Sequence, residues 1–271
     1  MKTFKNFALN HPVLFSLVMI ALYPVLVFLT YPVNYLFPET EAGLLYSGAM
    51  TKLILCAVLL MILWRFGWLS AAGIARFRGI KTWPAIAMIL IYHLVINLYA
   101  FTGEISTVTS NSPLGLANLV YYLPASLFEE ILFRGLILLA MLLAWGETRR
   151  GVAKAVLFSS LFFGLIHLFN LAEIPLDVVL LQVLGAGMLG ILWAALTLIT
   201  HSLWPAILLH WLTNAAVNIQ LIGTEDFQET TTMFATQAVL LIPLVVFGGY
   251  LIWKLTSQAP VEHELTPIWK G

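Results

Sequence analysis

The sequence contains little of what soluble enzymes and redox proteins use. Its one cysteine, Cys56, can form neither an intramolecular disulfide nor a multi-cysteine metal site. Only 10% of the 271 residues are charged, whereas about a quarter are charged in soluble domains. The net charge is zero, so bulk electrostatics gives no indication of a nucleic-acid partner. With 61% hydrophobic residues, the composition predicts an all-α, polytopic membrane protein.

Several motifs that support hydrolysis are absent as well. There is no Gly-x-Ser-Gly nucleophile and no His-Glu-x-x-His zinc helix. The only aspartates, Asp177 and Asp226, both fall in predicted loops, so they cannot form an aspartyl dyad within a bilayer. Acid–base chemistry at membrane depth is therefore left to glutamate and histidine.

Apolar segments long enough to cross a bilayer follow one another along the chain. We expect residues 1–271 to form a single transmembrane domain with a polar tail over 254–271. Eight spans are predicted, at about 12–30, 47–68, 84–101, 116–144, 153–171, 178–200, 203–221 and 234–253.

An even number of spans places both termini on one side of the membrane. All of the 13 Lys and Arg fall on that side except Arg134, which lies within the fourth span, and Lys52, which is predicted on the opposite side. The positive-inside rule therefore predicts cytoplasmic termini. The compact loops are typical of a prokaryotic protein, so we expect it in the cytoplasmic membrane.

Three charged residues, Glu129, Glu130 and Arg134, interrupt the fourth span. Each costs about 2.5–3.5 kcal/mol near a bilayer centre, so their presence indicates a use. On a helix, Glu130 and Arg134 share a face and can pair, whereas Glu129 is turned about 100° away. A structural ion pair that stabilises a helix bundle would explain Glu130 and Arg134. It would leave Glu129 as a free carboxylate.

Further polar groups occur at helical spacing in later spans. His167 shares a face with Phe163 in the fifth span, and His210 shares one with Asn214 in the seventh. Each pair alone is also typical of an interhelical hydrogen bond. Together with Glu129, they would supply a water activator, an electrophile and a donor that stabilises an anion. The sixth span should let these helices pack closely, because it contains Gly185, Ala186, Gly187 and Gly190.

Three short motifs occur in order on separate spans: Glu-Glu-x-x-x-Arg at 129–134, Phe-x-x-x-His at 163–167 and His-x-x-x-Asn at 210–214. They resemble the signatures of the CAAX protease and bacteriocin-processing family, also called the Abi family. The resemblance covers about residues 118–218, without a departure at any motif position. It implies an eight-helix intramembrane endopeptidase. Its expected partners are the bilayer and a peptide or protein substrate, including a membrane-associated or lipidated C-terminal tail, and no nucleic acid.

The resemblance also implies a role for each motif residue. Glu129 would be the general base that activates water, and His167 would help to position or deprotonate that water. His210 and Asn214 would stabilise the tetrahedral oxyanion. The supporting residues would be Glu130 held by Arg134, and Phe163 packed beside His167.

A metal-dependent reaction is the alternative within the enzyme class. Glu129, His167 and His210 amount to two histidines and a carboxylate, which is a catalytic zinc set. We expect no metal, because Arg134 would lie close to the cation and because the resemblance implies a metal-independent enzyme.

Two non-enzymatic functions are also alternatives. A membrane scaffold or bacteriocin-immunity protein would act by binding alone. A proton-coupled transporter could use intramembrane Glu and His as a relay. The sequence shows no duplicated half with a second Glu-Glu-x-x-x-Arg motif, which disfavours the transporter.

Overall fold

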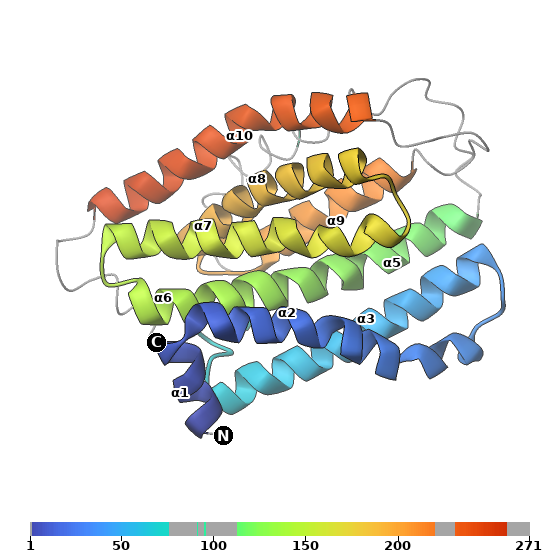
Figure 1. Ribbon diagram of the computed structural model, residues 1–271, viewed down its shortest axis with the longest axis horizontal. Helices are drawn as coiled ribbons and strands as arrows, with labels where there is room; N and C mark the ends of the chain where they lie inside the picture. Colours follow the sequence, from blue (N-terminus) through green and yellow to red (C-terminus); the bar gives the residue numbers. More distant parts are fainter. Residues whose placement is uncertain (1, 76–90, 92–94, 96–112, 220–230, 259–271) are drawn as a thin grey trace.

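A computed structural model describes residues 2–75, 91, 95, 113–219 and 231–258, and these residues contain helices and no strand (Figure 1). All-α architecture is therefore confirmed for the described part of the chain. In chain order, the elements are α1 (Lys2–Asn10), α2 (Pro12–Leu29), η1 (Tyr31–Leu36), α3 (Glu41–Phe66), α5 (Pro113–Glu130), η3 (Ile131–Leu138), α6 (Leu139–Trp145), α7 (Arg149–Leu165), η4 (Ile166–Ala172), α8 (Leu176–Thr200), α9 (Trp204–Ile219) and α10 (Thr231–Gln258).

Five helical segments of the described residues are long and apolar enough to cross a membrane: 12–36, 41–66, 149–172, 176–200 and 235–257. They coincide with five of the eight predicted spans. Two more predicted spans are also helical, but one carries three charges (α5, η3 and α6) and the other is described over 16 residues (α9). The predicted span 84–101 lies outside the described residues apart from Ile91 and Val95. The full number of eight spans therefore stays a prediction.

The segment formed by α5, η3 and α6 runs through the middle of the molecule (Figure 1). Every residue from 130 to 142 is buried, so η3 and the start of α6 have no exposed face. Such all-round burial is typical of a core helix. α5 packs against α3 on one side and α9 on the other, while α8 packs against α7 and α10. Residues of the central segment are thus held within reach of α9 and α7.

The part of this segment that follows Glu130 is a π-helix, η3. A π-helix has wider turns than an α-helix and is found frequently at functional sites. Here it begins directly after the pair of glutamates and contains Arg134. The change of helix type therefore coincides with the charged cluster.

Glycines allow α7 and α8 to approach each other closely. A Cβ atom on Gly190 would lie 2.9 Å from the Cα of Ser160, and a Cβ on Gly164 would lie 2.5 Å from the carbonyl oxygen of Val183. Real Cβ atoms do not come so close to backbone atoms, so only glycine fits at both positions. The expected role of small residues in the sixth span is confirmed at Gly190 and is shared by Gly164 on the neighbouring helix.

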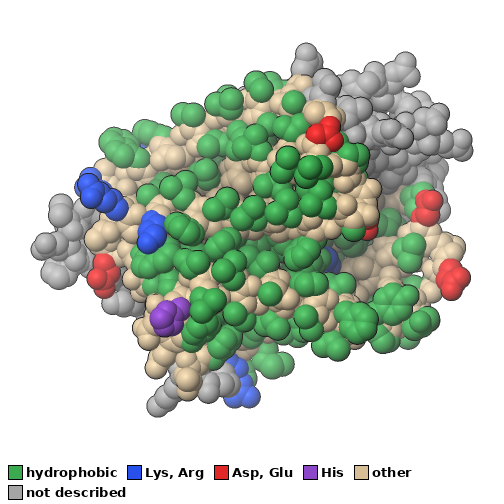
Figure 2. All heavy atoms as spheres, in the orientation of Figure 1, with side chains coloured by type: hydrophobic (Ala, Val, Ile, Leu, Met, Phe, Trp, Pro, Cys, Tyr) green, Lys and Arg blue, Asp and Glu red, His purple; other side chains and the backbone are tan. Residues whose placement is uncertain are grey.

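Charge is distributed between the two ends of the helices. Figure 2 shows a largely apolar side surface, with basic side chains toward one end and most acidic ones toward the other. Along α7 and η4, the exposed Arg149 and Arg150 open the first turn, and the exposed Glu173 follows the last residue of η4. α1 begins and α10 ends at the same end of the molecule (Figure 1). This asymmetry is the pattern on which the predicted topology rests.

Candidate active site within the helix bundle

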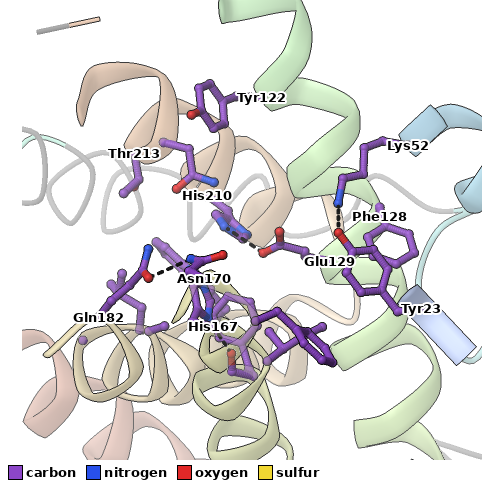
Figure 3. Close-up of a pocket in the computed structure, with 18 of the residues that line it drawn as sticks. Tyr23, Lys52, Tyr122, Phe128, Glu129, His167, Asn170, Gln182, His210 and Thr213 are labelled. Carbon is purple, nitrogen blue, oxygen red and sulfur yellow. Dashed lines mark hydrogen bonds and ion pairs between the residues drawn. The ribbon is translucent and has the colours of Figure 1, made fainter. Parts of the chain in front are cut away.

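A cavity of about 550 Å³ lies between the helices. Its volume falls within the range of about 300–1,000 Å³ that is usual for ligand pockets. Five of the predicted site residues line it: Glu129 from α5, Phe163 from α7, His167 from η4, and His210 and Asn214 from α9. Figure 3 shows Glu129, His167 and His210 around this space. The structure thus brings together residues that are up to 85 positions apart in the sequence, 129 and 214.

The two adjacent glutamates have different surroundings. The side chain of Glu130 is completely buried, and its Oε1 accepts a hydrogen bond of 2.9 Å from Nη1 of Arg134, as the i, i+4 spacing predicts. The side chain of Glu129 remains 21% exposed and lines the cavity. Arg134 also donates from Nη2 to the carbonyl oxygen of Gly190 at 3.3 Å, which links the central segment to α8. Glu130 is therefore the clamped carboxylate, and Glu129 is the one that can meet a substrate.

His210 lies between these two carboxylates. Its Nδ1 is 2.8 Å from Oε1 of Glu130. Its Nε2 is 3.6 Å from Oε2 of Glu129, and Figure 3 shows this second contact. Because a carboxylate can only accept, Nδ1 must be the donor of the first contact. This leaves Nε2 as the nitrogen that faces Glu129. Sequence reasoning paired Glu130 with Arg134 alone and missed that Glu130 also orients His210.

His167 is oriented by the backbone. Its Nδ1 donates to the carbonyl oxygens of Phe163 at 3.0 Å and Gly164 at 3.3 Å, so Nε2 is the nitrogen available to the cavity. These carbonyls lie in the last turn of α7, where the chain changes from an α-helix to the 3₁₀-helix η4. The helical segment that is long and apolar enough to cross a membrane continues to Ala172, and it contains His167.

Aromatic rings hold the imidazoles and the guanidinium in place. The ring of Phe163 meets His167 edge-on at 5.5 Å and His210 at 5.6 Å between ring centroids, and Cζ of Arg134 lies 4.2 Å from its centroid. The predicted packing of Phe163 beside His167 is thus present, and Phe163 contacts two further site residues. The buried Trp193 of α8 stacks on His210, with 6.2 Å between centroids and 20° between the planes. These contacts restrict the side-chain rotations of His210.

Lys52 corrects a sequence-based prediction. We expected it on the outer side, opposite the termini, but its side chain lies inside the bundle, is 8% exposed and lines the same cavity as Glu129. The helix α3 begins at Glu41, several residues before the predicted start of the span. The side chain of Thr40 caps this helix by accepting a hydrogen bond from the backbone N–H of Gly43 at 3.1 Å. Lys52 therefore lies in the fourth turn of α3 and not near its end.

Uncharged polar side chains complete the cavity wall, and sequence reasoning did not single them out. The amide of Asn170 donates to the side-chain oxygen of Gln182 at 2.8 Å, between η4 and α8 (Figure 3). The buried Gln237 of α10 also lines the cavity. The signal was available, because an amide within an apolar span is as rare as a histidine there. That these amides line the same cavity as Glu129 could be seen only in the tertiary structure.

The positions of these side chains also bear on a metal site. Within the described residues, no group of three or more His, Cys, Asp and Glu side chains is placed to hold a metal ion. In the set Glu129, His167 and His210, each imidazole uses Nδ1 in a hydrogen bond, and Nε2 of His210 lies 3.6 Å from Glu129. The arrangement is that of a carboxylate–imidazole pair with a second imidazole nearby.

The fold and the cavity define a helical membrane protein with a buried cluster of acid–base side chains. Comparison with protein families identifies this cluster further. Residues 111–216 match the family described as Rce1-like, type II CAAX prenyl endopeptidase, and the match contains all seven predicted site residues. Through this segment the chain is similar to the CAAX protease family, as its three motifs indicate. Searches of curated proteins and of solved structures found no match.

The family match supports the coarser features of the expected function. CAAX-type endopeptidases are peptide hydrolases, so the match indicates a protease that acts on a peptide substrate. The apolar helices and the family together describe an integral membrane protein. The expected resemblance, over about 118–218, agrees with the matched segment.

Proposed function

We propose that this protein is an intramembrane endopeptidase in which Glu129 activates a water molecule. The observation that supports this most is that the adjacent Glu129 and Glu130, which both lie near the His210 imidazole, differ in burial and in hydrogen-bond partners. Glu130 is fully buried and bound by Arg134 and His210, whereas Glu129 faces the cavity. A general base must be reachable by the water it deprotonates, and only Glu129 meets that condition.

The proposed reaction begins with a water molecule between Glu129 and the scissile carbonyl. Glu129 accepts a proton from it, with Nε2 of His167 helping to orient the water, and the resulting hydroxide adds to the carbonyl carbon. The C–O double bond becomes a tetrahedral oxyanion. Glu129 then returns the proton to the leaving nitrogen as the C–N bond breaks, so that one water is consumed for each peptide bond.

The proposed oxyanion donors are His210 and Asn214, which lie one turn apart on α9. Because Nδ1 of His210 already donates to Glu130, a donor at Nε2 makes this side chain an imidazolium. The two neighbouring carboxylates stabilise that positive charge in a site of low dielectric. A preorganised donor of this kind contributes about 2.7–4 kcal/mol to lowering a reaction barrier.

The substrate class follows from the family and the location. We propose peptides or proteins that reach the cavity from the membrane, with a lipidated, CAAX-type C-terminal tail as the first candidate. The basic end of the helices would face the cytoplasm, with both termini there, in an eight-span topology. The compact loops suit a prokaryotic cytoplasmic membrane.

The test is hydrolysis by Glu129→Gln, which keeps the shape of the side chain and removes the base. With a fluorescence-quenched, prenylated CAAX peptide and purified protein in nanodiscs, we expect the rate to fall by about 10²- to 10⁴-fold while peptide binding persists. Glu147→Gln is the matched control, because Glu147 is exposed in the turn after α6 and lies outside the cavity. Undiminished hydrolysis by Glu129→Gln would contradict the assignment.

Two further readouts separate the alternatives. If the reaction needs no metal, activity should withstand chelators, whereas loss on chelation and recovery with zinc would favour a metal site at Glu129, His167 and His210. If the protein protects cells by binding alone, as a scaffold or immunity protein would, that protection should survive in Glu129→Gln.

A further inference from the structure

Lys52 is a buried cation that the proposed reaction does not use. Its Nζ donates to the hydroxyl of Tyr23 at 2.7 Å and lies 4.6 Å from the ring centroid of Tyr23 and 4.9 Å from that of Phe128 (Figure 3). An ammonium group has three N–H donors, and Tyr23 uses one of them. A lysine at this depth is costly and is retained mostly where it has a function.

No carboxylate of the described residues forms an ion pair with Lys52. Glu130 is already bound by Arg134 and His210, and the nearest partner of Glu129 is His210. Among the described residues that line the cavity, Lys52 is the one Lys or Arg. The cavity therefore contains a cation that can still donate hydrogen bonds to an anionic ligand and that lies beside aromatic side chains.

The position of Lys52 limits what this anion can be. Phe128, whose ring contacts the ammonium group of Lys52, directly precedes the proposed base Glu129 in the sequence. Phe128 is 2% exposed and Lys52 is 8% exposed, so the cation is buried where it lines the cavity. The end of a peptide chain brings a carboxylate to this cation whatever the sequence, whereas the middle of a chain brings one only at Asp or Glu.

We propose that Lys52, together with the hydroxyl of Tyr23, binds the terminal carboxylate of the peptide segment that leaves after cleavage. This rests on the proposed endopeptidase function and adds a specificity determinant to it. A charge-assisted hydrogen bond would hold the chain end at the wall formed by α2 and α3, while Glu129 acts on a bond upstream. The distance between Lys52 and Glu129 would then set how many residues are removed.

The experiment compares peptides that differ only at the chain end. One carries a free C-terminal carboxylate, a second carries a carboxamide, and a third carries a carboxamide after a terminal Glu, so that its carboxylate lies on a side chain. For the wild-type protein, we expect kcat/KM for the free carboxylate to exceed that for the carboxamide by about 10- to 100-fold, as for one charge-assisted hydrogen bond. The third peptide should resemble the second.

The variant Lys52→Met keeps the length and apolar stem of the side chain and removes the ammonium. We expect it to bring the carboxylate-to-carboxamide ratio of kcat/KM close to one. Tyr23→Phe removes the hydroxyl alone and should lower the ratio by less. Lys154→Met is the matched control, because Lys154 is exposed on α7, stacks on Trp145 at 4.1 Å and lies outside the cavity, so it should keep the wild-type ratio.

Each outcome decides the proposal. A wild-type ratio near one, or a ratio that Lys52→Met leaves unchanged, would overturn it in favour of Lys52 acting on Glu129 or on the fold. A preference for the third peptide equal to that for the first would show that any carboxylate suffices, which also contradicts a chain-end site. Should Lys52→Met fail to fold, Tyr23→Phe gives the same comparison.

Failure of the proposed function can be told apart from failure of the subsite. If the wild-type protein cleaves none of the three peptides, binding of the same peptides to Glu129→Gln is measured by fluorescence anisotropy. Tighter binding of the free carboxylate that Lys52→Met abolishes in this background would sustain the subsite without the hydrolysis. Equal binding of carboxylate and carboxamide would refute it.

Discussion

Removing Arg134 should destabilise the whole bundle. The side chains of both Arg134 and Glu130 have no exposed surface, and Oε2 of Glu130 has no hydrogen-bond partner among the described residues. In Arg134→Ala, His210 would be the remaining partner of a buried carboxylate. Breaking a buried pair by removing one partner costs about 3–5 kcal/mol. For a chain of this size, that corresponds to a fall in Tm of about 6–20 °C.

The measurement is thermal unfolding in detergent, followed by intrinsic fluorescence of the nine tryptophans. A double variant, Glu130→Met with Arg134→Met, removes both charges and should recover part of the lost stability, because an apolar pair avoids an unpaired charge. Full recovery is not expected, since Nδ1 of His210 loses its acceptor. If Arg134→Ala melts within about a degree of wild type, the pair does not hold the bundle, and the reasoning fails.

Two other predictions concern α8 and α9. Gly190→Ala should lower Tm, because its Cβ would lie 2.9 Å from the Cα of Ser160. Gly185→Ala on the same helix should not lower Tm, because its Cβ would meet only a side-chain atom, at 3.9 Å. Equal melting temperatures of the two variants would contradict the close approach of α7 and α8. Asn214→Ala should lower kcat by about 10²- to 10³-fold with little change in KM, as expected for a donor that acts in the transition state. A rise in KM at unchanged kcat in steady-state assays would instead assign Asn214 to substrate binding.

Local relations in the sequence were predicted correctly. The pairing of Glu130 with Arg134 follows from i, i+4 spacing on one helix, and the structure has it at 2.9 Å. The contact of Phe163 with His167 follows from the same spacing. Such contacts need only the knowledge that the segment is helical, which its apolar length indicates.

Contacts between distant segments could not be predicted from the residues alone. Glu130 and His210 are 80 positions apart, and their contact depends on how α5 packs against α9. The π-helix after Glu130 gave no signal either, because a segment buried on all sides has no apolar periodicity from which its register could be read. These features come from tertiary packing.

The misplacement of Lys52 has an instructive cause. Hydropathy placed the start of the second span at about residue 47, so Lys52 appeared close to a membrane surface. The helix begins six residues earlier, at Glu41, after the capping residue Thr40. Thr at an N-cap followed by Glu in the first turn is a helix-start signal that hydropathy ignores. A helix start predicted from this cap would have placed Lys52 more than one helical turn further from the end of the helix.

Acidic and basic side chains of the site lie close together among the described residues. Glu129 and Glu130 supply two carboxylates, Arg134 and Lys52 supply two cations, and the imidazolium proposed at His210 adds one more positive charge. An uncompensated charge at this depth would cost several kcal/mol, so an excess of positive charge favours the binding of an anion.

Arg134 and Lys52 differ in their partners, and this difference supports the proposed chemistry. Arg134 is bound to Glu130, whereas Lys52 forms no ion pair with Glu129, although both line the cavity. Glu130 and Arg134 therefore form a structural ion pair, whereas Glu129 and Lys52 line the same cavity without forming one. A peptide that places its carbonyl at Glu129 and its terminal carboxylate at Lys52 would provide Lys52 with an ion pair. Binding the substrate would then satisfy the charge that the fold leaves unpaired, which gives the protein a physical reason to prefer an anionic chain end.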